Sequence, residues 1–127
     1  MAAVQTWKLP ADYGADVFDG VAVSLFELYR ARMARKQPMI SGVTFRDCRI
    51  EGPAVLLVID GCTFDGVRFG ASNGDMRNIV LHPASPTSVT GALPIKDCTF
   101  QGGHFFGVGF TGAPTFLQQL LDLGKAQ

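Results

Sequence analysis

Residues 95–112 read Ile-Lys-Asp-Cys-Thr-Phe-Gln-Gly-Gly-His-Phe-Phe-Gly-Val-Gly-Phe-Thr-Gly, and this stretch decides the fold. Phe100, Phe105 and Phe110 recur every five residues, and a glycine stands two positions after each of them. A helix repeats about every 3.6 residues and a strand about every two. A sustained period of five therefore predicts a backbone that turns at regular intervals.

The same period occurs earlier in the chain. Each group of five has a large apolar residue at its centre, a small or medium apolar residue two positions before it, and often a glycine two positions after it. The centres are Phe45, Ile50, Phe64, Phe69, Phe100, Phe105 and Phe110. Residues two apart on an extended segment point to the same side, and a glycine then permits a sharp turn. The pattern predicts a chain that winds around an apolar axis.

The groups that carry this pattern are Val-Thr-Phe-Arg-Asp (43–47), Cys-Arg-Ile-Glu-Gly (48–52), Cys-Thr-Phe-Asp-Gly (62–66), Val-Arg-Phe-Gly-Ala (67–71), Cys-Thr-Phe-Gln-Gly (98–102), Gly-His-Phe-Phe-Gly (103–107) and Val-Gly-Phe-Thr-Gly (108–112). They resemble the pentapeptide-repeat family in a short, interrupted form. The resemblance implies a mainly β fold, a right-handed quadrilateral β-helix. We expect about three coils over residues 39–112, with an insertion at 70–94, within a single domain of residues 1–127.

The longer spacing of the apolar residues predicts how the coils stack. The expected columns are Ile40–Ile59–Ile95, Phe45–Phe64–Phe100 and Ile50–Phe69–Phe105, with Val55 and Phe110 on a fourth side. A single coil cannot bury its apolar edge, so stacking would supply the core.

An N-terminal arm and an amphipathic helix are expected over residues 1–38. Val21, Leu25 and Leu28 fall on one stripe of a helix at 16–36, and Pro38 would end it. Arg30, Arg32, Arg35 and Lys36 gather at its C-terminal end. These cations suit the helix dipole, which is the interpretation we favour, and a phosphate or partner contact is the alternative.

A second helix is predicted over residues 113–127, where it would cap one end of the stack. Its apolar residues are too many for one narrow stripe, so a homodimer contact through this terminal helix is weighed equally with capping alone. The candidate interface residues are Phe116, Leu117, Leu120, Leu121 and Leu123.

Composition limits the classes of partner. Eleven basic and eleven acidic residues give a net charge of zero, so the chain produces no overall field to attract nucleic acid or to imitate it. The longest apolar run, Ala54–Ile59, is far shorter than the roughly 18 residues of a membrane span. Three cysteines and the absence of a signal peptide favour reduced thiols in the cytoplasm. We expect no nucleic-acid partner and no membrane.

No motif predicts catalysis, a cofactor or a metal. Residues 107–112 match Gly-x-Gly-x-x-Gly, but the βαβ unit and the later acidic residue of a dinucleotide site are missing. Cys48, Cys62 and Cys98 lack Cys-x-x-Cys spacing, so they are interpreted as small core residues. His104 falls at an outward position with no nucleophile assigned to it.

The sequence therefore favours a non-enzymatic interaction or scaffold module that forms a homodimer and binds an unidentified protein. One alternative is a DNA mimic that modulates a type II topoisomerase, as some pentapeptide-repeat proteins do. Another is a small-ligand binder that uses a groove between the loop at 82–91 and the helix at 16–36, with His82 and Arg35 in its wall.

Overall fold

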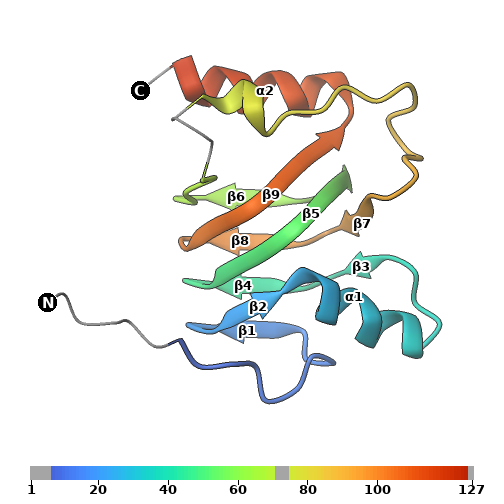
Figure 1. The fold of residues 1–127 in the computed structure, drawn as a ribbon, viewed down its shortest axis with the longest axis vertical. Coiled ribbons are helices and arrows are strands. Elements are labelled where there is room, and N and C mark those ends of the chain that lie inside the picture. The colour runs from blue at the N-terminus through green and yellow to red at the C-terminus, as the bar shows by residue number, and fades with distance from the viewer. Residues whose placement is uncertain (1–6, 71–74, 126–127) are drawn as a thin grey trace, which may run out of the picture.

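The computed structural model describes residues 7–70 and 75–125. Its elements in chain order are β1 (Val17–Asp19), β2 (Ala22–Ser24), α1 (Leu25–Ala34), β3 (Ile40–Ser41), β4 (Thr44–Arg46), β5 (Arg49–Asp60), β6 (Thr63–Asp65), the 3₁₀ helix η2 (Met76–Asn78), β7 (Leu93–Lys96), β8 (Thr99–Gln101), β9 (His104–Gly112) and α2 (Pro114–Lys125). Figure 1 shows the strands stacked below α2, with α1 on the flank of the stack beside β2.

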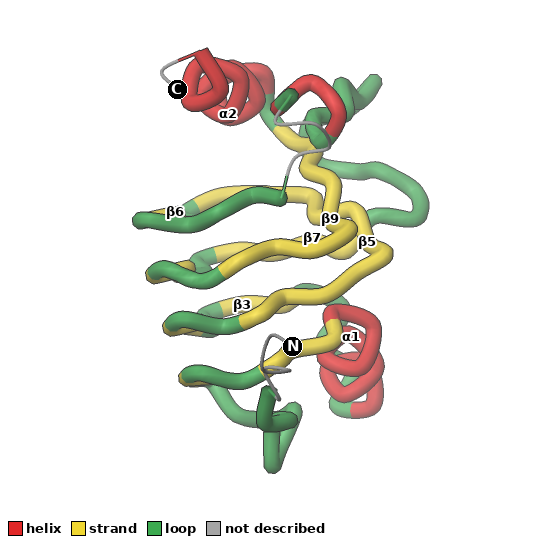
Figure 2. The backbone as a smooth tube through the Cα atoms, turned by 60° about the vertical axis from the view of Figure 1, so that its left-hand side comes forward, coloured by secondary structure: helices red, strands yellow, loops and turns green. Residues whose placement is uncertain are grey.

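The strands form two sheets, and every pairing between the named strands is parallel. One sheet has the order β1-β4-β8-β6. The other has the order β2-β5-β7-β3, and β9 also pairs with β5. Figure 2 shows the strand segments lying one above another as the rungs of a stack.

The expected right-handed quadrilateral β-helix is wrong. The protein has an α/β fold with parallel strands in two sheets, one of them curled, and two α-helices among the described residues. Coils wound in sequence would place β6 next to β4. Instead, β8 lies between β4 and β6, so a later segment of the chain is inserted between two earlier ones.

The long strand β5 explains this insertion. Its first residues pair with β2, whereas Leu56–Val58 pair with β7, so the strand crosses the stack obliquely (Figure 1). The run Ala54–Ile59 contains no glycine and continues the strand where a coil would have turned. In the sheet that contains β5, β7 lies between the end of β5 and β3, and in the other sheet β8, which follows β7 in the chain, lies between β4 and β6.

Stacked phenylalanine rings form the centre of the core. Phe18, Phe45, Phe100 and Phe64 follow one another with centroid separations of 5.6, 4.8 and 4.9 Å. The predicted contact of Phe100 with Phe64 is confirmed, but the predicted order Phe45–Phe64–Phe100 is wrong, because Phe100 stands between the other two rings. Aromatic rings at these separations contribute beyond the area that they bury.

Two other predicted columns are partly right. Phe69 stacks on Phe105 at 5.7 Å as expected, but Ile50 pairs with Phe105, so Phe105 and not Phe69 is the middle member of that column. In the remaining column Val58 pairs with Ile95, and Ile59 lies at a shift in register before Asp60. Both Val58 and Ile59 of the apolar run could have paired with Ile95. The shift in register after Val58 leaves Val58 as the partner.

Turns with positive φ generate the period of five. One stack of turns contains Gly20, Asp47, Gly102 and Gly66, whose φ angles lie between 48° and 66°. Left-handed backbone is easiest for glycine and is tolerated by aspartate. The glycines and aspartates of the repeat therefore turn the chain at equivalent places on each rung.

The predicted helix at 16–36 is shorter than expected. Residues 17–24 form β1 and β2, since Phe18 and Val23 join the core ladders. Ser24 then caps α1 by accepting a hydrogen bond from the Glu27 amide at 3.3 Å. Leu25 and Leu28 are buried as predicted, whereas Phe26 is 61% exposed on the outer face.

The two ends of the stack are covered differently. At the lower end, Lys8 pairs with Val21 beside β2. At the upper end, α2 is confirmed as a helix, and it contacts β9 and η2. The predicted insertion at 70–94 contains η2 and returns to the stack at Val80, which bridges to Phe110. Residues 71–74 of that insertion and 126–127 of the last helix lie outside the described residues.

Candidate binding groove

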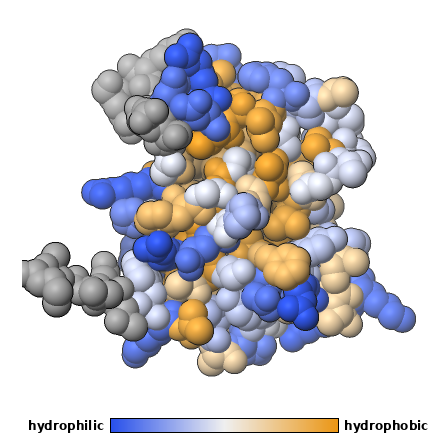
Figure 3. Space-filling view, viewed as in Figure 1, coloured by the Kyte–Doolittle hydropathy of each residue, from blue (hydrophilic) through white to orange (hydrophobic). Residues whose placement is uncertain are grey.

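A groove of about 540 Å³ lies between β6 and α2. Its residues are mainly apolar or aromatic, with a few polar groups at the rim: Cys62, Thr63, Phe64, Phe69, Phe116, Gln119, Leu120, Asp122 and Leu123. Ligand-binding pockets commonly measure about 300–1,000 Å³ and have this kind of lining. In Figure 3, apolar side chains also gather below α2 and over the oblique strands β9 and β5.

The floor of the groove is the end of the phenylalanine stack. Phe64 has Phe100 against one side, 4.9 Å away, and β6 is the terminal strand of its sheet among the described residues. Phe69 and Phe116 each approach the Phe64 ring at 5.7 Å. Because α2 is seated over β9 and η2, the edge of β6 is left beside an incompletely filled space.

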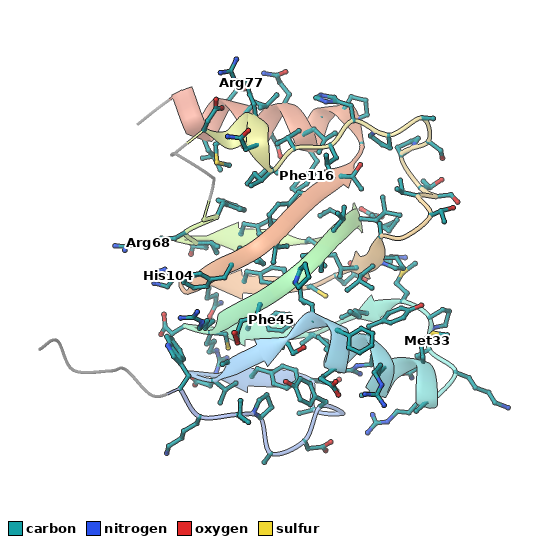
Figure 4. All side chains as sticks on the ribbon, in the orientation of Figure 1. Met33, Phe45, Arg68, Arg77, His104 and Phe116 are labelled. Carbon is teal, nitrogen blue, oxygen red and sulfur yellow. The ribbon has the colours of Figure 1, made fainter. Side chains whose placement is uncertain are left out.

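The five candidate interface residues of α2 divide into two groups. Leu117 and Leu120 belong to the buried core, and Phe116 and Leu121 are partly buried against it. Leu123 is 48% exposed and stands at the groove. Figure 4 shows Phe116 at the α2 end of the molecule. Leu120 contributes to both the core and the groove wall.

Two thiols meet at the floor of the groove. Thr63 of β6 pairs with Thr99 of β8, so Cys62 and Cys98, one residue earlier, are neighbours as the sequence predicted. Cys98 is buried, whereas Cys62 is partly exposed and lines the groove. The interaction between the two neighbouring thiols lowers the pKa of Cys98 and raises the pKa of Cys62. Burial raises the pKa of Cys48, which lies elsewhere in the core.

The alternative site at the loop is not assembled. A cavity of about 200 Å³ beside the loop is lined by Val55, Leu81, Thr111 and residues 89–92, without His82 or Arg35. The Arg35 guanidinium instead donates to the Gly14 carbonyl oxygen at 3.2 Å. His104 packs beside Phe106, with ring centroids 5.8 Å apart. Within residues 7–70 and 75–125, no group of three or more His, Cys, Asp and Glu side chains is arranged to hold a metal ion.

Sequence reasoning missed the strand side of the groove. The residues Cys62, Phe64 and Phe69 had been expected inside a continuous stack, with a third coil above them. They line a groove because β8 is inserted below β6, which leaves β6 at the edge. The one signal in the sequence was the run Ala54–Ile59, which has no glycine to turn the chain. Its effect on the order of the strands depends on which distant segments pair, and local spacing does not show that.

No protein-family model, curated protein or solved structure matches the chain. None of the described helices is long and apolar enough to cross a membrane.

Proposed function

We propose that this protein is a non-catalytic protein-interaction module that forms a homodimer through the groove between α2 and β6. The observation that carries the proposal is a half-exposed leucine, Leu123, at the rim of an apolar groove of about 540 Å³. An exposed leucine beside unfilled apolar space is the arrangement expected of a surface that another chain covers.

A second copy of this chain fits the groove for a geometric reason. In a two-fold interface the same patch is used on both subunits, so the patch must be complementary to itself. Here the projecting residue Leu123 and the hollow floored by Phe64 lie on one patch. Each copy would insert Leu123 toward the other copy's groove. A net charge of zero means that the two copies do not repel each other through their overall field.

The rim supports the same arrangement. Gln118 of α2 donates a hydrogen bond to Asp122 at 2.9 Å, and Gln119 and Asp122 border the groove. Polar residues surrounding an apolar centre are typical of protein interfaces.

The three cysteines carry no disulfide, which fits a reducing compartment, and we propose a cytoplasmic location.

The oligomeric state tests the proposal. We expect size-exclusion chromatography with light scattering to give twice the chain mass of 13.6 kDa. Leu123→Asp is expected to raise the dimer dissociation constant by about 100-fold, because a buried carboxylate must lose its water. Leu81→Asp is the matched control, since Leu81 is 47% exposed but lies outside the groove. A monomer at millimolar concentration, or equal effects of the two substitutions, would contradict the homodimer.

Labelling of Cys62 offers an independent check. Cys62 lines the groove and is the most exposed of the three thiols, so a maleimide should modify it before Cys48 or Cys98. The raised pKa of Cys62 should make the reaction slower than that of a free cysteine. We expect the labelling rate, followed by mass spectrometry, to fall as the protein concentration rises. In Leu123→Asp the rate should not depend on concentration, and a concentration dependence there would point to a different interface.

A further inference from the structure

A buried arginine belongs to α1, which lies toward the other end of the strand stack from α2 (Figure 1). Arg32 extends from α1, and its side chain is only 6% exposed. Its Nη2 donates to the Ala15 carbonyl oxygen at 2.7 Å, and its Nη1 donates to Oδ1 of Asp16 at 3.5 Å. Its Nε is buried and has no hydrogen-bond partner among the described residues.

The charge of Arg32 is incompletely compensated. Removing a cation from water is costly unless a well-placed anion and further hydrogen bonds replace the lost hydration. The Asp16 side chain is 75% exposed, and its contact with Arg32 is long. The guanidinium has already lost most of its water when the protein folds. An anion that contacted it more closely than Asp16 does would therefore bind without a further cost of removing water from the arginine.

A cavity of about 420 Å³ adjoins this arginine. Lys36, Gln37 and Ser41 supply donors to its lining, and Pro38 and Met39 supply apolar surface. The carbonyls of Arg32 and Met33 at the end of α1 accept the amides of Gln37 and Lys36 at 2.9 Å. The positive charges of Arg32 and Lys36 offset the negative end of the helix dipole at this cavity. Asp16 is the acidic group in the lining.

We propose that this cavity binds the phosphate group of a small phosphate monoester. The phosphate would take the place of the Asp16 carboxylate on Arg32 and would pair with Lys36, since a guanidinium matches phosphate oxygens with parallel hydrogen bonds. A doubly charged phosphate suits two cations better than a carboxylate does. The volume exceeds that of phosphate alone, so Pro38 and Met39 would contact the organic part of the ligand.

The experiment is calorimetric titration of the full chain with glycerol phosphate, inorganic phosphate and acetate. We expect glycerol phosphate to bind most tightly and acetate about tenfold more weakly than phosphate. Affinity should rise as the pH increases through about 6, where a phosphate monoester gains its second charge. Equal binding of glycerol phosphate and inorganic phosphate would limit the site to the free ion and overturn the monoester assignment. Absence of heat with all three ligands would overturn the site.

Substitutions separate a binding site from a structural arginine. Lys36→Gln should weaken phosphate binding about tenfold, and Arg32→Met should abolish it. Asp16→Asn should strengthen binding several-fold, because it removes the competing carboxylate, whereas a purely structural role of Arg32 predicts no gain. Arg68→Gln is the control, because Figure 4 places Arg68 on the opposite side of the molecule from Met33 of α1. If Arg32→Met does not fold, the proposal is still tested by the opposite effects on phosphate affinity expected of Lys36→Gln and Asp16→Asn. An equal loss of phosphate affinity in Arg68→Gln and Lys36→Gln would overturn the proposal.

Discussion

Phe100→Ala is expected to destabilise the protein by about 3–5 kcal/mol, the range for truncating a buried phenylalanine. Phe100 is 1% exposed, and its ring lies between Phe45 at 4.8 Å and Phe64 at 4.9 Å. Both neighbours belong to other strands, so the cavity left by the ring would be bounded by two rungs that cannot close around it. Since the total free energy of unfolding of a domain is about 5–15 kcal/mol, the variant is expected to be only marginally stable.

Urea unfolding followed by circular dichroism measures this loss, and Phe26→Ala provides the control. Phe26 is 61% exposed on α1, so its truncation should change the free energy of unfolding by about 0.5 kcal/mol or less. A comparable loss in both variants would mean that the outer face of α1 is covered in solution. A loss below about 1 kcal/mol for Phe100→Ala would contradict the ring stack itself.

The position of Phe100 also shows how far the sequence predicts this fold. The period of five identifies inward residues correctly, because a small residue and a large one two apart must share a side of an extended segment. Phe45, Phe64 and Phe100 accordingly lie in one ladder. Their order could not be predicted, since any order of parallel rungs satisfies the same local pattern. It is set by β5, which continues obliquely where a turn was expected.

The first helix was mispredicted because two periods overlap. Val21, Leu25 and Leu28 fit a helical stripe, but Phe18 and Val23 also fit the five-residue repeat with Phe45 and Ile50. The positive φ of Gly20 allows the turn between β1 and β2, and burial of both residues in the ladders outweighs helix formation there. The helix therefore begins only after Ser24.

The candidate groove was only half predictable. The surplus leucines of 113–127 pointed to α2 as a surface with a second role, and Leu123 does stand exposed at a groove. The strand side depends on Phe64 lying at the end of a stack, which follows from the long-range order of rungs. A pattern of local spacing indicates which residues point inward, but it carries no information on which rung is last.

Gly103→Ala is expected to cost about 3 kcal/mol, because it combines a strained backbone with a steric clash. Gly103 precedes β9 with a φ of 83°, a conformation that residues with a Cβ atom rarely adopt. An added Cβ would overlap the carbonyl oxygen of Cys48 and lie 2.8 Å from its amide nitrogen. Neither group can move easily, because the Cys48 carbonyl accepts the His104 amide at 2.9 Å and Cys48 is buried.

Gly66→Ala separates the two contributions. Gly66 has a similar left-handed φ of 64°, but an added Cβ would meet nothing within 4 Å. It should therefore lose only the backbone term, about 1 kcal/mol. The midpoint and slope of urea unfolding measure both variants, and an unchanged slope would show that the difference lies in the native state. If the two substitutions cost the same, the start of β9 does not lie against Cys48. The pairing of β9 with β5, which places α2 over the end of the stack, would then have to be revised.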